Sequence, residues 1–409
     1  MSDARALTAP AARPGAATRA DGAGHLLALI RSGRAATVSE MAAGVGASRS
    51  TVMARLEALT TAGLVAPRPP AGGARGRPAT AYAFDPTSAV LLAAQLGMTG
   101  CRLAATDLAG EILGSRYIDV DLRQGPDRLT SDMIDAYDDM LAEIGRDATG
   151  VVGIGLGMPS AVEMMSYSRS LGVTGSGWDS SGIDRTLSDR YGAPAVVDLD
   201  VNMLALAERR TSWPDVEVFV CVKLGTLIDA AIVVNDSPVR GVGNAAGALG
   251  HLKVAGSTEP CTCGGIGCLD AVAGGGALVK QLRAAGFDVT HVSDVIGLVN
   301  SGQPEALLAV REAGRRIGEA LSSIVNLLNP AVISTWGYLT GAESVLFAGI
   351  REGLYQSALP RSSEELRLVV TSLGESAGVR GAAMRVIDEV LDPSTLDRSL
   401  ESGRFPARR

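Results

Sequence analysis

From residue 88 onward, short apolar runs alternate with longer segments in which apolar residues recur every three or four positions. The short runs are typical of buried strands, and the longer segments have the periodicity of amphipathic helices, as in 128–145 and 304–330. The expected strands cover residues 89–97, 102–108, 150–159, 193–200, 218–225, 230–236, 331–337 and 366–374. This alternation predicts an α/β protein. About 300 residues are too many for one core, so we expect two lobes with a cleft between them.

The chain in front of this region has a different pattern. Residues 24–33 form one short apolar-periodic helix, and residues 37–65 form two more that are joined by a turn at 44–47. Ser48 is placed to cap the last helix. The inward face of that helix has apolar residues at i, i+4 and i+7, namely Val52, Leu56 and Leu59. A glycine-rich turn and a strand with alternating Thr80, Tyr82 and Phe84 follow, so the segment has the order of a winged helix-turn-helix.

The formal charge also differs between these two regions of the chain. Residues 1–85 contain ten arginines and five acidic residues, a balance of +5, so the other 324 residues carry −12 of the total of −7. A basic helix that enters the major groove reads bases with Arg and contacts phosphates with Ser or Thr, and Arg in a flexible wing fits a narrow minor groove. The candidate DNA contacts are Arg49, Ser50, Thr51 and Arg55 on the helix, and Arg75 and Arg77 in the wing. The alternative for the wing is an arginine-rich linker.

Three of the five cysteines lie within eight positions, in "CTCGGIGC" at 261–268. Cys261 and Cys263 are separated by one residue, so a disulfide between them would be strained. Glycines at 264 and 267 can bend the chain so that three thiolates face one point. The pattern therefore favours a structural zinc site, with the ligands His251, Cys261, Cys263 and Cys268. The alternative is a group of small buried cysteines beside a free histidine.

The first twenty residues are rich in Ala, Arg and Pro and lack the apolar stretch of a secretory signal. No apolar run reaches the length of about 20 residues that crosses a bilayer. We therefore expect a cytoplasmic protein that has no membrane partner.

The chain as a whole resembles the ROK family, whose members are sugar kinases of the actin-like ATPase (ribonuclease H-like) fold and repressors that add a winged helix. The resemblance runs from about residue 22 to 392 and depends on several separated motifs. They are "GALGHLKV" with "CTCGGIGCLD", "VVGIGLGMPS", "GW" at 177–178, "VVDLDVNMLALAE" and "SLGESAGVRGAA". In the family, the cysteine motif is a zinc clasp that holds a sugar-binding loop.

The phosphate-binding motifs of the family's kinases are altered here. Their Asp-x-Gly-Gly-Thr-Lys corresponds to "QLGMTG", in which Gln95 replaces the aspartate and Met98 a glycine. Their second loop, Gly-Thr-Gly-x-Gly-x-Gly, corresponds to "GTLIDAA", which places Leu227, Asp229 and Ala231 where a triphosphate would lie. A carboxylate repels phosphate, and the Gly-Gly of the nucleotide-base region is Trp336–Gly337. The resemblance therefore implies a protein that is not an enzyme.

The sugar contacts of the family are partly kept. The kinases' general base corresponds to Asp200, which without ATP is expected to be vestigial, and the neighbouring Asn is Leu199. The family Glu next to the histidine is Ala248. The effector pocket that the resemblance implies consists of Asp200, His251 and Asp270. A buried hydroxyl left unpaired costs about 1–3 kcal/mol, so a typical hexose is expected to bind weakly. A different molecule as effector, or no effector at all, stays an open alternative.

These observations predict the following domains: a tail at 1–20, the winged helix-turn-helix at 21–85, a first lobe at 86–200 completed by 376–392, a second lobe with the zinc motif at 201–375, and a tail at 393–409. The predicted function is a transcriptional regulator, a repressor of carbohydrate-related genes, that reads an inverted repeat in double-stranded DNA as a homodimer or homotetramer. An active ROK sugar kinase with an added DNA-binding domain is the alternative, and a regulator that responds to a protein partner also stays open.

Overall fold

The computed structural model describes residues 22–68, 80–160, 180–403 and 405. The predicted tail at 1–20, the wing arginines Arg75 and Arg77, and the "GW" motif lie outside the described residues. The described chain forms two compact units. One consists of the residues up to Val90, together with 107–109 and the residues from Ile387 onward, and the other consists of 91–106 and 110–386. Residues 86–90, which the sequence assigned to the first lobe, therefore belong to the same unit as the N-terminal helices.

Three helices and a two-stranded sheet make up the N-terminal part of the first unit. They are α1 (Ala23–Arg31), α2 (Val38–Val45), α3 (Arg49–Thr61), β1 (Val65–Arg68) and β2 (Ala81–Phe84). α2 starts with a capping box in which the Thr37 hydroxyl and the Glu40 carboxylate each accept from the other residue's backbone N–H, and it ends at Gly46 in the left-handed region. β1 and β2 are antiparallel, and Thr37 forms a bridge to Ala81 beside them. This order confirms the expected helix-turn-helix and the expected strand near residues 80–84, and it adds β1, which the sequence analysis did not predict.

The first unit also contains a helix from the other end of the chain. α15 (Pro393–Glu401) packs against α1 with Leu396 fully buried, and the Asp397 carboxylate accepts a hydrogen bond of 2.8 Å from the backbone N–H of Gly24. Gly24 is required at this contact, because a Cβ there would lie 2.3 Å from the carbonyl oxygen of Pro393. The prediction of a tail from residue 393 is therefore wrong for residues 393–401.

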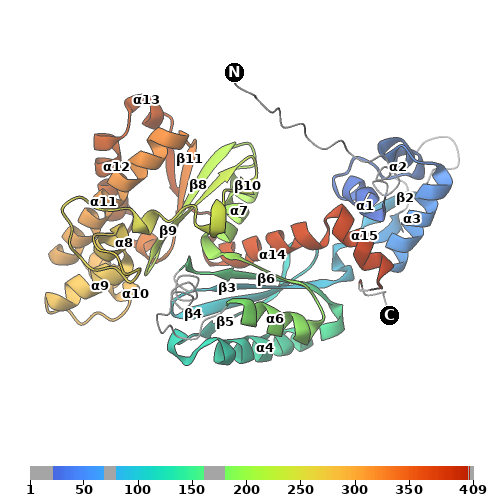
Figure 1. The fold of residues 1–409 in the computed structure, drawn as a ribbon, viewed down its shortest axis with the longest axis horizontal. Helices are drawn as coiled ribbons and strands as arrows, with labels where there is room; N and C mark the ends of the chain where they lie inside the picture. Colours follow the sequence, from blue (N-terminus) through green and yellow to red (C-terminus); the bar gives the residue numbers. More distant parts are fainter. Residues whose placement is uncertain (1–21, 69–79, 161–179, 404, 406–409) are drawn as a thin grey trace, which may run out of the picture. The chain divides into compact units, whose positions relative to one another are not determined.

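The first sheet of the second unit has the strand order β5-β4-β3-β6-β7. Its strands are β3 (Val90–Leu96), β4 (Gly100–Thr106), β5 (Ile112–Asp119), β6 (Val151–Met158) and β7 (Ala195–Leu199). Its helices are α4 (Pro126–Glu143), α6 (Ser180–Tyr191), α7 (Asp200–Ser212) and α14 (Ala377–Val390). Figure 1 shows α4 and α6 on one face of this sheet and α14 on the other. There Val379, Ala382 and Ala383 of α14 pack with Ala93 and with Met203 of α7.

The second sheet has the order β10-β9-β8-β11-β12. Its strands are β8 (Val218–Leu224), β9 (Ile228–Val234), β10 (Ser237–Pro238), β11 (Val332–Trp336) and β12 (Arg367–Val370). Alternate residues of β8 enter different cores, since Val220 and Val222 pack with the helices from α8 onward and Phe219 and Cys221 pack with α7. The remaining helices are α8 (Leu269–Ala273), α9 (Gly275–Ala284), α10 (Val292–Asn300), α11 (Pro304–Leu328), α12 (Glu343–Ser357) and α13 (Pro360–Ser363).

Short 3-10 turns connect these elements. They are η1 (Pro86–Ser88), η2 (Leu122–Gln124), η3 (Ala148–Gly150), η4 (Val242–Asn244), η5 (Leu249–His251), η6 (Tyr338–Ala342) and η7 (Gly374–Ser376). No helix among the described residues is long and apolar enough to cross a membrane.

Candidate functional sites

The exposed side of α3 is the first candidate site. Ser48 caps the helix as predicted, since its hydroxyl accepts from the backbone N–H of Thr51. Arg49 and Ser50 are exposed and Thr51 is half-buried. The Arg49 guanidinium donates to the Ser39 hydroxyl on α2, so the side chain is directed by the neighbouring helix. The helix therefore presents one arginine and two hydroxyl groups near its N-terminus, where a helix in the major groove contacts bases and phosphates.

Arg55 lies one turn farther along α3. The sequence predicts that its side chain points outward, but the structure places the side chain partly inside. The residue is half-buried, and its Nη1 has no solvent exposure and no hydrogen-bond partner among the described residues. The predicted inward face is confirmed, because Val52, Leu56 and Leu59 are at most 1% exposed. Arg55 therefore has a buried stem and a guanidinium that still lacks one acceptor.

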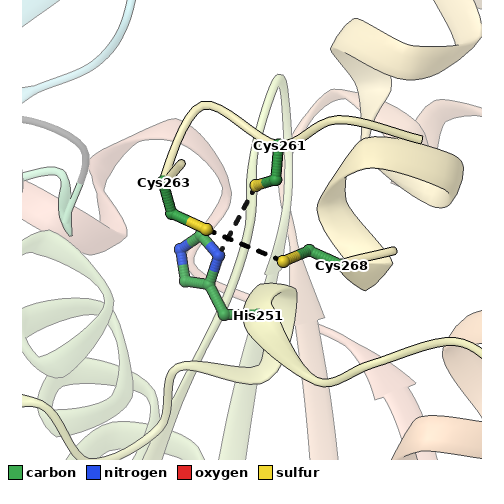
Figure 2. Close-up of side chains that lie close together, drawn as sticks. All are labelled: His251, Cys261, Cys263 and Cys268. Carbon is green, nitrogen blue, oxygen red and sulfur yellow. Dashed lines mark hydrogen bonds between the residues drawn. The ribbon is translucent and has the colours of Figure 1, made fainter. Parts of the chain in front are cut away.

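A cluster of four metal-ligand side chains is the second candidate site. Figure 2 shows His251 and Cys261, Cys263 and Cys268 pointing toward one another. One donor atom from each of these residues lies within 4.8 Å of all the others. The Cys263 and Cys268 sulfurs are 3.7 Å apart, and the Cys261 sulfur is 3.8 Å from Nδ1 of His251.

These distances fit one tetrahedral ion. Zn–S bonds of about 2.3 Å and Zn–N bonds of about 2.0 Å place the ligand atoms of a regular tetrahedron about 3.5–3.8 Å apart. The donor set, three thiols and one imidazole, is that of structural zinc sites, and it uses all four positions. The four residues can therefore hold a zinc ion without any change of fold.

The backbone of the loop brings the cysteines together. Gly264 and Gly267 have φ values of 84° and 70°, and a Cβ on Gly267 would lie 2.6 Å from the carbonyl oxygen of Ser257. The Lys253 ammonium donates to the Cys268 sulfur at 3.1 Å and to the carbonyl of Ile266 at 2.7 Å. Lys253 thereby joins the segment after His251 to the loop that carries the cysteines.

A cavity of about 310 Å³ in the second unit is the third candidate site. Its lining comes from both sheets: the turn between β3 and β4 and strand β5 on one side, and the turn after β8 and the segments after β11 and β12 on the other. The stretches that correspond to the kinases' phosphate and nucleotide-base motifs lie here, since Gln95, Met98, Leu227 and Trp336 all line the cavity. The volume is at the lower end of the range of small-molecule pockets.

A buried ion pair lies at the cavity. Asp200, the first residue of α7, is 1% exposed and pairs with the ammonium of Lys223 on β8. The other carboxylate oxygen, Oδ1, is buried without a hydrogen-bond partner among the described residues. Burial raises the pKa of Asp200, and the charge of Lys223 opposes this increase. Sequence reasoning missed Lys223, although a lysine inside the apolar run "VFVCVKLG", one of only three in the chain, was an available signal.

A second carboxylate lies beside this pair. Asp229 on β9 is 6% exposed and directly opposite Lys223 in the antiparallel register. Burial raises its pKa to about 6; hydrogen bonding from Ser160 and the charge of Lys223 oppose the increase, and the nearby charge of Asp200 adds to it. Of the three residues that the sequence placed where a triphosphate would lie, only Leu227 lines the cavity, whereas Asp229 and Ala231 are buried outside its lining.

The three residues of the predicted effector pocket are only partly brought together. Asp200 lines the cavity, but neither His251 nor Asp270 does. His251 faces the cysteines. The Asp270 carboxylate accepts from the backbone N–H of Ile228 at 2.8 Å, and burial raises its pKa to about 6. The common pocket therefore stays a prediction.

Aromatic and charged side chains line the more exposed part of the cavity. The Trp336 indole N–H donates to the carbonyl of Gly374 at 2.8 Å. Arg102 pairs with Glu375, and its guanidinium lies 5.6 Å from the centre of the Tyr117 ring. Each of the cations that line the cavity, Arg102 and Lys223, thus has a carboxylate partner.

Comparisons with known proteins agree on one family. The model of the ROK family matches residues 91–389. The chain is 23% identical to the xylose repressor of Bacillus subtilis, over 88% of this chain and 92% of that protein, and 28% identical to a glucokinase of Halalkalibacterium halodurans, over 71% and 93%. The crystal structure of a ROK family transcriptional regulator, a homologue of the E. coli MLC protein, superimposes with a TM-score of 0.74 at 23% identity, covering 95% of this chain and all of that one. This likeness confirms the expected two-lobed actin-like fold.

Proposed function

Because the chain belongs to the ROK family, we propose that it is a DNA-binding transcriptional repressor of sugar-related genes. The observation that carries this proposal is the capped, partly basic helix α3 within a winged helix-turn-helix, in front of a kinase-like body whose phosphate-binding stretches are altered. The similarity of this chain to the xylose repressor extends over 88% of the chain and also supports the proposal. The effector class that we propose is a sugar or a sugar derivative, with Asp200, His251 and Asp270 as candidate contacts.

The proposed partner is an inverted repeat in double-stranded DNA, bound by a homodimer or homotetramer. One winged helix makes too few contacts for useful affinity at physiological salt, so two copies are needed.

We expect that Arg49→Ala reduces the discrimination between operator and random DNA by about 1–3 kcal/mol, because it removes an exposed side chain that can read base edges. Arg55→Ala is expected to have a smaller effect, because part of that guanidinium is buried. Arg75→Ala with Arg77→Ala is expected to weaken binding to most sequences and to flatten its salt dependence. The measurement is a titration at two salt concentrations on DNA from the protein's own promoter region. Arg123→Ala is the matched control, because this arginine is 91% exposed after β5 and pairs locally with Asp121. Wild-type affinity and selectivity in all the α3 and wing variants would contradict the regulator proposal.

The body is proposed to have no sugar kinase activity. Leu227 lines the cavity at the turn in which the kinases have glycine, and the buried carboxylate of Asp229 lies two residues farther along the chain, so a triphosphate would meet an apolar side chain and a nearby negative charge. We expect that the purified protein with ATP and glucose or xylose forms no more sugar phosphate than a heat-killed sample. Formation above that background that Asp200→Asn abolishes would instead support the alternative, an active kinase with an added DNA-binding domain.

The cysteine cluster is proposed to hold a structural Zn²⁺ through His251, Cys261, Cys263 and Cys268. A bound ion would join the segment at His251 to the start of α8, which follows Cys268 directly. We expect about one zinc per chain by elemental analysis and loss of most of it in Cys263→Ser, together with loosening of residues 240–275 in hydrogen exchange. Thr262→Ser, which changes the exposed neighbour of two ligands, should keep its zinc. A native zinc content of less than about half an equivalent would show that the zinc assignment is wrong.

A further inference from the structure

We propose that the cavity between the two sheets binds an uncharged small molecule that has hydroxyl groups at one end and a flat ring at the other, in the place where the family's kinases hold a nucleotide. This inference deepens the effector-sensing part of the proposed function. It depends on the proposed function only for its regulatory consequence, because binding to the cavity can be measured without DNA.

The inner end of the cavity needs a group that both donates and accepts hydrogen bonds. Asp200 lines the cavity, and its buried Oδ1 has no donor among the described residues. A buried carboxylate oxygen without a donor is costly, so a ligand that supplies one is favoured. The Lys223 ammonium has three N–H donors, of which the ion pair with Asp200 uses one. A hydroxyl group meets both requirements, because it donates to Asp200 and accepts from Lys223.

The outer end offers flat apolar surfaces. Trp336, Tyr338 and Tyr117 all line the cavity, and the hydrogen bond to Gly374 fixes the indole in place. Tyr338 is 55% exposed, which leaves much of its ring without a protein contact. Aromatic rings stack against one another and bind the apolar faces of sugar rings, so this end suits the flat part of a ligand.

The charges of the cavity exclude anionic ligands. The ammonium of Lys223 is paired with Asp200 and the guanidinium of Arg102 with Glu375, so neither cation is left over for a phosphate. Asp229 adds a further carboxylate near the inner end. A nucleotide or a sugar phosphate would therefore lose its hydration shell without gaining a counter-charge.

Two sources have the required chemistry, namely a nucleoside and an aryl glycoside. We would measure thermal shifts and calorimetric titrations of the full chain with adenosine and with p-nitrophenyl β-D-glucoside, each at millimolar concentration. ATP and glucose 6-phosphate are the anionic counterparts. We expect that adenosine or the glucoside raises the Tm by about 2 °C or more and that neither anion does so. A shift with only one of the two identifies the source, whereas no shift with either, or an equal shift with ATP, would overturn the proposal.

Two variants locate the bound ligand. Tyr338→Ala should weaken binding about two- to tenfold through loss of ring contact, whereas Tyr355→Ala on α12 should not, although that tyrosine is 56% exposed and thus closely matched. Asp200→Asn should weaken binding by about tenfold or more, because it removes a charged acceptor. If Asp200→Asn does not fold, the comparison of Tyr338→Ala with Tyr355→Ala still tests where the ligand binds. Wild-type affinity in Tyr338→Ala would show that the ligand binds outside the cavity. If the wild-type protein does not bind operator DNA, the proposal of a transcriptional regulator is contradicted. The ligand titrations remain valid in that case, because they do not use DNA.

Discussion

Replacing Lys223 with methionine is expected to lower the free energy of unfolding by about 3–5 kcal/mol at neutral pH. The lysine is the ion-pair partner of Asp200, and the two side chains are only 11% and 1% exposed. Methionine keeps the length of the side chain but leaves the buried carboxylate without a counter-charge. Removing one partner of a buried pair is more costly than removing both, because the remaining charge is left desolvated.

Chemical denaturation of matched variants tests this expectation. Lys280→Met is the control, because Lys280 is 73% exposed in its pair with Glu259, and it should change stability by less than about 0.5 kcal/mol. The double variant Asp200→Asn with Lys223→Met should recover much of the loss, because no unpaired charge remains. An unchanged denaturation midpoint in Lys223→Met would show that the pair does not stabilise the protein.

The elements whose pattern is local were predictable. The eight expected strands correspond to β3, β4, β6, β7, β8, β9, β11 and β12, because each lies in a short apolar run of the sequence. Six of these strands are mostly buried, whereas β7 is partly buried and β12 has no buried residue. Strand β5 was missed, although its residues alternate between half-buried and exposed positions at the edge of the first sheet. Its glycine and charged residues are unlike those of the buried strands, so a search for continuous apolar runs did not find it.

α15 was missed for a different reason. Its sequence, PSTLDRSLE, contains only two large apolar residues, and polar residues of this kind are typical of a terminal tail. Leu396 is buried, and Gly24 donates a hydrogen bond to Asp397, which is 373 positions away in the sequence. A local sequence pattern cannot predict contacts between residues so far apart.

The candidate sites show the same difference between features set by local sequence and features set by long-range contacts. The four metal-ligand candidates lie within 18 residues, and the glycines between the cysteines already showed how the chain turns, so the cluster followed from spacing. The pairing of Lys223 with Asp200 depends on how β8 of one sheet faces the first residue of α7, which follows the other sheet. Sequence could show that a lysine in an apolar strand needs a partner, but only the topology identifies that partner.

Replacing Asp229 with asparagine is expected to stabilise the protein at neutral pH, by up to about 3 kcal/mol. Burial raises the folded-state pKa of this carboxyl from 3.8 to about 6, and each pKa unit corresponds to about 1.4 kcal/mol. Between about pH 4 and 6 the folded protein therefore binds more protons at Asp229 than the unfolded chain does, so stability falls as the pH rises through this window. Above pH 6 the full cost of the buried charge is present. Asparagine removes this cost and can still accept a hydrogen bond from Ser160.

The measurement is the free energy of unfolding of wild type and Asp229→Asn at several pH values from 4 to 7.5. Asp270, whose pKa is also raised to about 6, and Asp200, whose pKa is also raised by burial, contribute slopes of the same sign, so the variant should flatten the wild-type slope and not remove it. Asp189→Asn is the control, because that residue is exposed on α6 and should leave both stability and slope unchanged. Equal pH dependence in wild type and Asp229→Asn would mean that Asp229 is not a buried charge. The proposal that the cavity excludes nucleotides would then lose one of its supports.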